Sequence, residues 1–198
     1  SKMLQSIDQW GDIEWSTMQD AFASCSNVDV LAKDVPNLSN VTDTSNMFLN
    51  CESLVGSSKF NKWNVSTLQK VDGMFEGTTL FNQILSNWDT SLITNMSAMF
   101  KDSGFKNSLG TWDVSQVTTM NQMFIGSQLT TINYDNTLVG WSRLPNLQSN
   151  IELDAGLSFF CFGEESKQRI IDTYNWSISD NGKECPEKNA FVTTWKTD

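Results

Sequence analysis

The 198-residue sequence predicts an α/β repeat solenoid made of short parallel strands and short helical or 3-10 segments. The first observation is a phenylalanine that recurs at intervals of 26, 27, 25 and 24 residues, at Phe22, Phe48, Phe75, Phe100 and Phe124. The second is a tryptophan twelve residues before four of these phenylalanines, at Trp10, Trp63, Trp88 and Trp112. A fixed period of about 25 residues is typical of stacked repeats, which bury their apolar faces only against their neighbours.

Each repeat contains two apolar patterns. Apolar side chains generally stand one, four and seven residues before the recurring phenylalanine, and before Phe100 they are Met99, Met96 and Ile93. This spacing is typical of one helix face, so Thr94–Lys101 is predicted to be a short helix or 3-10 segment. The pattern of residues 85–90 predicts a very short strand with Trp88 and Thr90 pointing inward. We therefore interpret the aromatic and methionine columns as core.

The expected repeats differ in regularity along the chain. Residues 1–15 are predicted to form an irregular first repeat that caps the stack. The weakest repeat covers residues 28–44, where Lys33 and Pro36 replace leucine and tryptophan. Proline suits an edge or the start of a strand, because it cannot donate to a ladder. The most regular repeats are Phe60–Leu80, Phe81–Gly104 and Phe105–Leu129.

From Tyr134 the pattern changes, and a C-terminal cap is expected. Its predicted elements are a helical turn at Asn136–Trp141, strands at Asn150–Leu153 and Trp176–Ser179, a helix at Glu164–Tyr174 and a turn at 180–182. The predicted domains are a repeat solenoid with an N-terminal cap over 1–133, a capping segment over 134–189, and a linker or following module from 190 to 198. We interpret the chain as a piece of a longer protein.

Composition argues against several functions. The net charge is −10 and the chain has no basic cluster, which disfavours nucleic acids and anionic membranes as partners. Histidine is absent, which removes the commonest general base and zinc ligand. No apolar run approaches the ~18 residues of a membrane span. Phosphate-binding glycine loops and serine nucleophile motifs are also absent. We therefore expect no enzyme activity, no cofactor, no metal site and no membrane insertion.

The four cysteines allow three pairings. Cys161 and Cys185 are 24 residues apart, about one repeat, and are the favoured disulfide if the compartment is oxidising. Cys25 and Cys51 each follow a recurring phenylalanine by three residues and should stack on adjacent repeats. They are candidates either for a second disulfide or for a buried ladder of thiols.

The repeats resemble those of a known family. The segments FNKWNVSTLQKVDGMFEG, FNQILSNWDTSLITNMSAMFK and FKNSLGTWDVSQVTTMNQMFIG are similar to BspA-type leucine-rich-repeat surface proteins, in the branch also found in mycoplasma lipoproteins. The resemblance covers Trp10–Leu129, and the tail looks like the ending of such arrays in secreted bacterial proteins of the Bacteroidetes type. It implies a right-handed leucine-rich-repeat-like superhelix on the cell exterior, which binds proteins or surfaces and is not an enzyme.

A polar row is the candidate binding face. Residues thirteen and eleven before the phenylalanine should point outward from the predicted strands; they are Lys62, Asn64, Asn87, Asp89, Thr111 and Asp113. The exposed sheet face is the usual binding surface of a stacked-repeat protein. Alternatively, these side chains cap the turns that follow them, at Asn64-Val-Ser66 and Asp113-Val-Ser115. Both interpretations stay open at this point.

These observations support three hypotheses of function. The first is a non-catalytic extracellular or cell-surface recognition and adhesion module that binds an extracellular protein or glycan. The second is a structural spacer in a larger cell-surface protein. The third is a glycan-processing enzyme that uses aspartate and glutamate, and the lack of a catalytic constellation disfavours it. The ligand, the parent architecture and the oligomeric state are left open.

Overall fold

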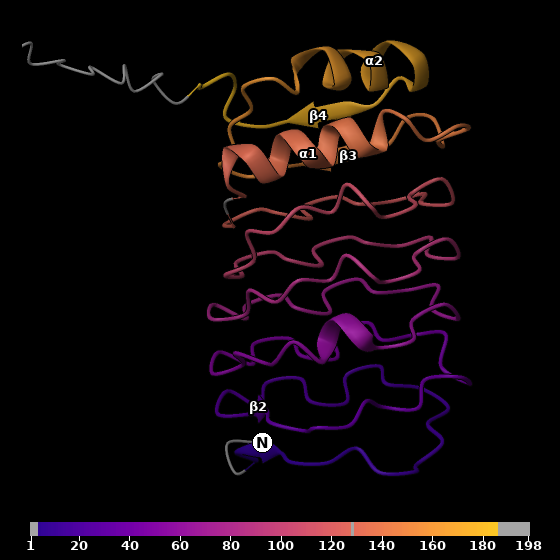
Figure 1. Cartoon of the computed structure of the whole chain (residues 1–198), viewed down its shortest axis with the longest axis vertical. Coiled ribbons are helices and arrows are strands. Elements are labelled where there is room, and N and C mark those ends of the chain that lie inside the picture. The colour runs from indigo at the N-terminus through magenta and orange to yellow at the C-terminus, as the bar shows by residue number, and fades with distance from the viewer. Residues whose placement is uncertain (1–3, 128, 186–198) are drawn as a thin grey trace, which may run out of the picture.

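The structure is a computed structural model that describes residues 4–127 and 129–185. Successive segments of the chain lie one on another along the long axis, with the N-terminal end at one extreme and the helices at the other (Figure 1). The elements, in chain order, are β1 Ser6–Ile7, β2 Asp29–Val30, the 3-10 helix η1 Phe60–Lys62, α1 Thr131–Trp141, β3 Glu152–Asp154, α2 Glu164–Tyr174 and β4 Ser177–Ser179. Neither α-helix of this part is long and apolar enough to cross a membrane.

The expected α/β repeat solenoid of the leucine-rich-repeat type is wrong. The described residues hold two α-helices, both after residue 130, and two parallel sheets of two strands each, β1–β2 and β3–β4. Thr94–Lys101, expected as a helix or 3-10 segment, consists of turns, and residues 85–90 form no strand. The phenylalanine repeats are therefore built mainly from turns.

A backbone requirement explains why no helix forms before the phenylalanine. The residues two before and two after each recurring phenylalanine have φ between 53° and 72°; they are Asp20, Ser24, Asn46, Asn50, Gly73, Gly77, Ala98, Asp102, Gln122 and Gly126. A left-handed residue interrupts a right-handed helix. It suits the third position of a type II turn instead. Accordingly, the N–H of Met99 donates to Met96 O at 3.3 Å, closing a turn around Ala98.

Alternate N–H groups of these turns bond to the following repeat. The amides of Ala98, Phe100 and Asp102 donate to the carbonyls of Asn121, Met123 and Ile125 at 2.9, 3.0 and 2.7 Å. Isolated parallel bridges join the same column of positions, at Asp43↔Lys70, Lys70↔Asn95 and Asn95↔Thr119. The hydrogen-bonded ladder thus lies where the sequence predicted a helix, and not along the tryptophan segment.

The interior consists of aromatic columns, as the sequence predicts. Trp63, Trp88 and Trp112 stack with ring centroids 6.5 and 5.8 Å apart, and each is at most 3% exposed. The phenylalanine rings at 48, 75, 100 and 124 stack in the same way, 5.8–5.9 Å apart. Burying one large apolar side chain contributes about 1.5–3 kcal/mol, so stacking these columns holds adjacent repeats together.

The C-terminal part is closer to its prediction. α2 has the predicted bounds, and β4 lies within its predicted range. β3 begins within its predicted range and ends one residue beyond it, at Asp154. α1 is longer than the expected turn and begins five residues earlier, where the Thr130 side chain caps it by accepting from Asn133 N. Figure 1 places α1 and α2 in successive layers at the same end of the molecule. The linker expected at 190–198 lies outside the described residues.

α1 packs directly on the backbone of the preceding repeat. The indole N–H of Trp141 donates to Leu109 O at 2.9 Å, and Leu109 N donates to the hydroxyl of Thr137 at 3.0 Å. Gly140 faces Gly110 so closely that a Cβ at position 140 would overlap the carbonyl group of Gly110. The helix therefore takes the place that an extended segment has in the earlier repeats.

A buried aspartate fixes the start of α2. Asp135, on α1, is fully buried, and its carboxylate accepts hydrogen bonds from the backbone N–H groups of Cys161, Phe162 and Gly163 at 3.0, 3.2 and 2.7 Å. Gly163 is the N-terminal cap residue of α2 and has no side chain that could cap it. Asp135 therefore supplies this helix with its anionic N-terminal partner from a distant part of the sequence.

Candidate functional site

The predicted polar row is on the surface. Lys62, Asn64, Asn87, Asp89 and Thr111 are exposed, and Asp113 is half-buried. The interpretation of these positions as outward-facing is therefore correct, although no strand carries them. Exposure alone does not make a binding face, so the partners of each side chain decide its role.

The acidic and amide groups of the row are used by the turns that follow them. Asn64 Oδ1 accepts from Ser66 N at 3.3 Å and from the Ser66 hydroxyl at 2.8 Å. Asp89 Oδ1 accepts from Ser91 N at 3.1 Å and from the Ser91 hydroxyl at 2.6 Å. Asp113 Oδ1 accepts from Ser115 N at 2.9 Å. These are Asx turns, so the turn-capping alternative is the one that the structure contains.

Two further members of the row, Thr111 and Asn87, form contacts with the preceding repeat. The Thr111 hydroxyl donates to Ser86 O at 2.9 Å, and the backbone N–H of Asn87 donates to Asn61 Oδ1 at 2.9 Å. Both contacts tie one repeat to the one before it. These two contacts stabilise the stack, whereas the exposed side chains of Lys62 and Asn87 form no hydrogen bond with the described part of the chain.

The turn bonds change the acidity of Asp89. The Ser91 hydroxyl, and next the Ser91 N–H, hold the pKa of Asp89 below its ordinary value of 3.8. Because the folded-state pKa is the lower one, these bonds stabilise the fold above the unfolded pKa, and this contribution is lost as pH falls through the folded pKa. We expect Ser91→Ala to raise the Asp89 midpoint toward 3.8 in an NMR titration of the side-chain carboxyl carbons. Thr111→Ala, which leaves these bonds in place, should not move it.

The cysteines separate into two kinds. Cys161 and Cys185 form a disulfide with Cα atoms 4.7 Å apart, the pairing that their spacing favours. Cys25 and Cys51 are buried and are not bridged to each other. The Cys51 thiol donates to Phe22 O at 3.1 Å, and burial, followed by the neighbouring Cys25, raises its pKa to about 12. Such a thiol is a poor nucleophile and metal ligand. Within residues 4–127 and 129–185, no three potential metal ligands of the His, Cys, Asp or Glu type cluster.

One cluster of titratable groups lies in the C-terminal part. The Tyr134 hydroxyl donates to Asp180 Oδ2 at 2.8 Å, and Lys167 Nζ lies 2.7 Å from the same oxygen. Lys167 also lies 4.9 Å from the ring centroid of Phe160. Burial, followed by Asp180, raises the pKa of Tyr134 well above its usual range. The phenol therefore stays protonated, and the cluster ties α1 and α2 to the turn after β4.

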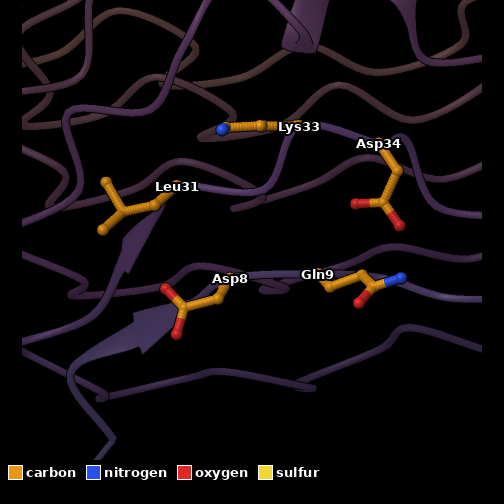
Figure 2. A pocket seen from close by; sticks show the side chains of 5 residues that line it. All are labelled: Asp8, Gln9, Leu31, Lys33 and Asp34. Atoms are coloured by element: carbon orange, nitrogen blue, oxygen red, sulfur yellow. The ribbon is translucent and has the colours of Figure 1, made fainter.

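A depression beside the first two strands is the candidate site. It has a volume of 480 Å³ and is lined by Asp8, Gln9, Leu31, Lys33 and Asp34. In Figure 2, Leu31, Lys33 and Asp34 come from the segment that continues β2 and stand opposite Asp8 and Gln9, which follow β1. The parallel pairing of β1 with β2 sets these two segments side by side.

The side chains around this depression differ in whether they form hydrogen bonds with the protein. Asp34 is held in place, because its carboxylate accepts from Trp10 N at 3.1 Å and from Gly11 N at 2.9 Å. These hydrogen bonds, first that of Gly11 and then that of Trp10, lower the pKa of Asp34. The side chains of Asp8, Gln9 and Lys33 are exposed and form no hydrogen bond or ion pair with the described part of the chain.

An exposed apolar strip continues from Leu31 into the next repeats. Asp29, two residues before Leu31, accepts from the backbone N–H of Val55 at 3.0 Å, and Gln83 donates to Val55 O at 3.0 Å. These contacts place Leu31, Val55 and Ile84 on one flank, where they are 58%, 45% and 56% exposed. We call these three residues the apolar flank.

Sequence reasoning missed this site. Lys33 stood out only as a departure from the repeat. Asp8 and Asp34 each stand fourteen residues before a recurring phenylalanine, but the later repeats carry no charge at that position. Gln9 belongs to the same column as Lys62, Asn87 and Thr111 and was not singled out. The available signal was that the irregular repeat carries the exposed cation Lys33 where the regular repeats carry phenylalanine or leucine.

Comparisons with known proteins give one match. The family model described as "Mycoplasma protein of unknown function, DUF285" matches residues 16–137. This range covers 122 of the 198 residues, including the five recurring phenylalanines and the first half of α1. No curated protein and no solved structure matches the chain.

Proposed function

We propose that this chain, which belongs to the DUF285 family of Mycoplasma proteins of unknown function, is a non-catalytic recognition and adhesion module. In this proposal it acts at the cell exterior and binds an extracellular protein or glycan. The observation that carries the proposal is the depression at Asp8, Gln9, Leu31, Lys33 and Asp34. The family match supports the likeness to BspA-type repeats on which the cell-surface role rests.

The depression suits recognition better than catalysis. Its volume of 480 Å³ lies within the ~300–1,000 Å³ of typical ligand sites. A cation at Lys33, a carboxylate at Asp8 and an amide at Gln9 can bond polar groups of a partner, and Leu31 offers an apolar contact. Of the two carboxylates that line the depression, Asp34 is bound to two backbone amides, and Asp8 forms no hydrogen bond with the described part of the chain.

The apolar flank extends the surface available to a partner. Three large apolar side chains are exposed on adjacent repeats, and one of them, Leu31, also lines the depression. A protein partner could cover the flank while its polar groups enter the depression. A glycan would use the depression alone.

A structural spacer remains the second candidate. The observation that favours it is the unbroken series of hydrogen bonds and stacked rings along the long axis, which gives an extended and rigid body (Figure 1). A spacer needs no ligand, so the two candidates differ in whether the isolated chain binds anything.

A binding screen followed by two pairs of variants separates these candidates. The chain is applied to arrays of glycans and extracellular matrix proteins, and hits are quantified by surface plasmon resonance. We expect Leu31→Ser and Lys33→Ala each to weaken binding about tenfold, the effect of losing ~1.4 kcal/mol of contact energy, with the melting temperature unchanged. Lys62→Ala and Asn87→Ala, in the polar row, are the controls and should bind normally.

Two results would count against the proposed site. If binding is lost in the Lys62 and Asn87 variants and kept in the Leu31 and Lys33 variants, the polar row is the binding face. If the chain binds nothing on either array, the spacer is the better description.

A further inference from the structure

The N-terminal end of the stack carries an uncovered apolar groove. It has a volume of 380 Å³, and its aromatic lining consists of Trp10, Trp15 and Phe22. Ile13, at its rim, is 52% exposed. In the later repeats the equivalent aromatic rings are covered on both sides by neighbouring repeats.

The indole groups of this groove lack the carbonyl partner that four later indoles have in the described part of the chain. Four tryptophans donate their indole N–H to a backbone carbonyl about one repeat earlier in the chain, over 2.7–2.9 Å: Trp88 to Phe60, Trp112 to Leu85, Trp141 to Leu109 and Trp176 to Gln148. Trp10 is 4% exposed, yet its indole N–H has no partner among residues 4–127 and 129–185, and neither has the buried N–H of Trp15. A buried donor without an acceptor is costly. The groove therefore lacks a carbonyl oxygen at this point.

The backbone at the same end offers a row of free acceptors. In each later pair of repeats, four amides of the earlier repeat, spaced two residues apart, donate to four carbonyls of the following repeat. Relative to the recurring phenylalanine of that following repeat, the four carbonyls stand five, three and one residues before it and one residue after it. In the first repeat the equivalent carbonyls are those of Thr17, Gln19, Ala21 and Ala23, and none of them accepts a backbone hydrogen bond from the described residues.

This arrangement selects the kind of partner that fits. The partner must present backbone N–H groups two residues apart, an apolar stripe, and a carbonyl oxygen for Trp10. A second copy related by a twofold axis fails, because it would set carbonyl groups against carbonyl groups. The far end of a second copy is closed by α2, whose outward side chains are charged or polar.

We infer that this groove binds a further repeat of the same type, which pairs its turn amides with Thr17, Gln19, Ala21 and Ala23 and accepts the indole N–H of Trp10. Residues 81–104 show what such a repeat supplies. The amides of Met96, Ala98, Phe100 and Asp102 are its four donors, spaced two residues apart. The carbonyl of Leu85 is its acceptor for an indole.

A fusion tests the inference on the whole chain. A copy of residues 81–104 is joined directly ahead of Ser1, which places the copied Phe100 26 residues before Phe22, the interval that separates Phe22 from Phe48. We expect its melting temperature to exceed that of a matched fusion, with aspartate replacing the copied Met96 and Phe100, by about 5 °C or more. Equal melting temperatures for the two fusions would overturn the inference.

Trp10→Phe distinguishes docking from general stabilisation. In the unfused chain it removes an unpartnered donor, so the melting temperature should stay the same or rise. In the fusion it removes a hydrogen bond, so the melting temperature should fall. The same change in both chains would contradict the inference. A concentration-dependent dimer that disappears in the fusion would also overturn it, because the groove would then belong to a second copy.

Discussion

Asp135→Ala is expected to lower the free energy of unfolding by about 3–5 kcal/mol, because three backbone N–H groups lose a buried charged acceptor at once. The affected amides are those of Cys161, Phe162 and Gly163, which lead into α2. Urea denaturation followed by tryptophan fluorescence measures the effect, because Trp141 and Trp176 are buried in this part of the molecule.

Asp172→Asn is the matched control for this prediction. Asp172 lies on α2 and is exposed, and the only hydrogen bond of its side chain in the described part is from the Gln168 side chain at 2.8 Å. Its replacement should change the free energy of unfolding by no more than about 0.5 kcal/mol. A loss of similar size in both variants would show that Asp135 has no special role at the start of α2.

Gly140→Ala is expected to destabilise the fold by about 2–3 kcal/mol, although alanine is normally the better helix former by about 1 kcal/mol. The physical reason is the close packing of α1 on the backbone of Gly110, which leaves no room for a methyl group. Since the obstacle is backbone and not a flexible side chain, relief requires α1 to move. Thermal unfolding monitored by circular dichroism gives the magnitude.

The control for this substitution is Asn136→Ala on the same helix. Asn136 is exposed, so the change should be neutral or slightly stabilising. If Gly140→Ala were also stabilising, the packing of α1 on residues 108–110 would be looser than the structure indicates.

The interior of this molecule could be predicted well from the sequence. The 12-residue interval between Trp88 and Phe100 and its copies identified the residues that stack, because burial needs only apolar side chains at matching positions. α2 was predicted at its bounds, since its polar outer face and acidic first turn are local signals.

The local structure of the repeats could not be derived from apolar spacing alone. Offsets of one, four and seven residues fit a helix, and they also fit successive type II turns that place every third or fourth side chain inward. The deciding signal was the residue two before and two after the phenylalanine. Asn46, Asn50, Gly73 and Gly77 are types that tolerate positive φ, whereas Ala98 gives no such indication.

The candidate site could not be predicted from the sequence for a different reason. It is formed where two irregular repeats lie side by side, and Asp8, Lys33 and Asp34 have no charged counterpart at the same positions of the later repeats. The carboxylate of Asp34 gains its position from amides 23 and 24 residues away, and no local pattern predicts such a contact.

The three stacked indoles give this chain an optical property of its own. Trp63, Trp88 and Trp112 lie nearly parallel, with interplanar angles of 15° and 6°. At these separations their electronic transitions couple, so light absorption is shared among neighbouring rings. Circular dichroism in the indole bands therefore reports directly whether adjacent layers are in register, and no attached label is needed to follow their assembly.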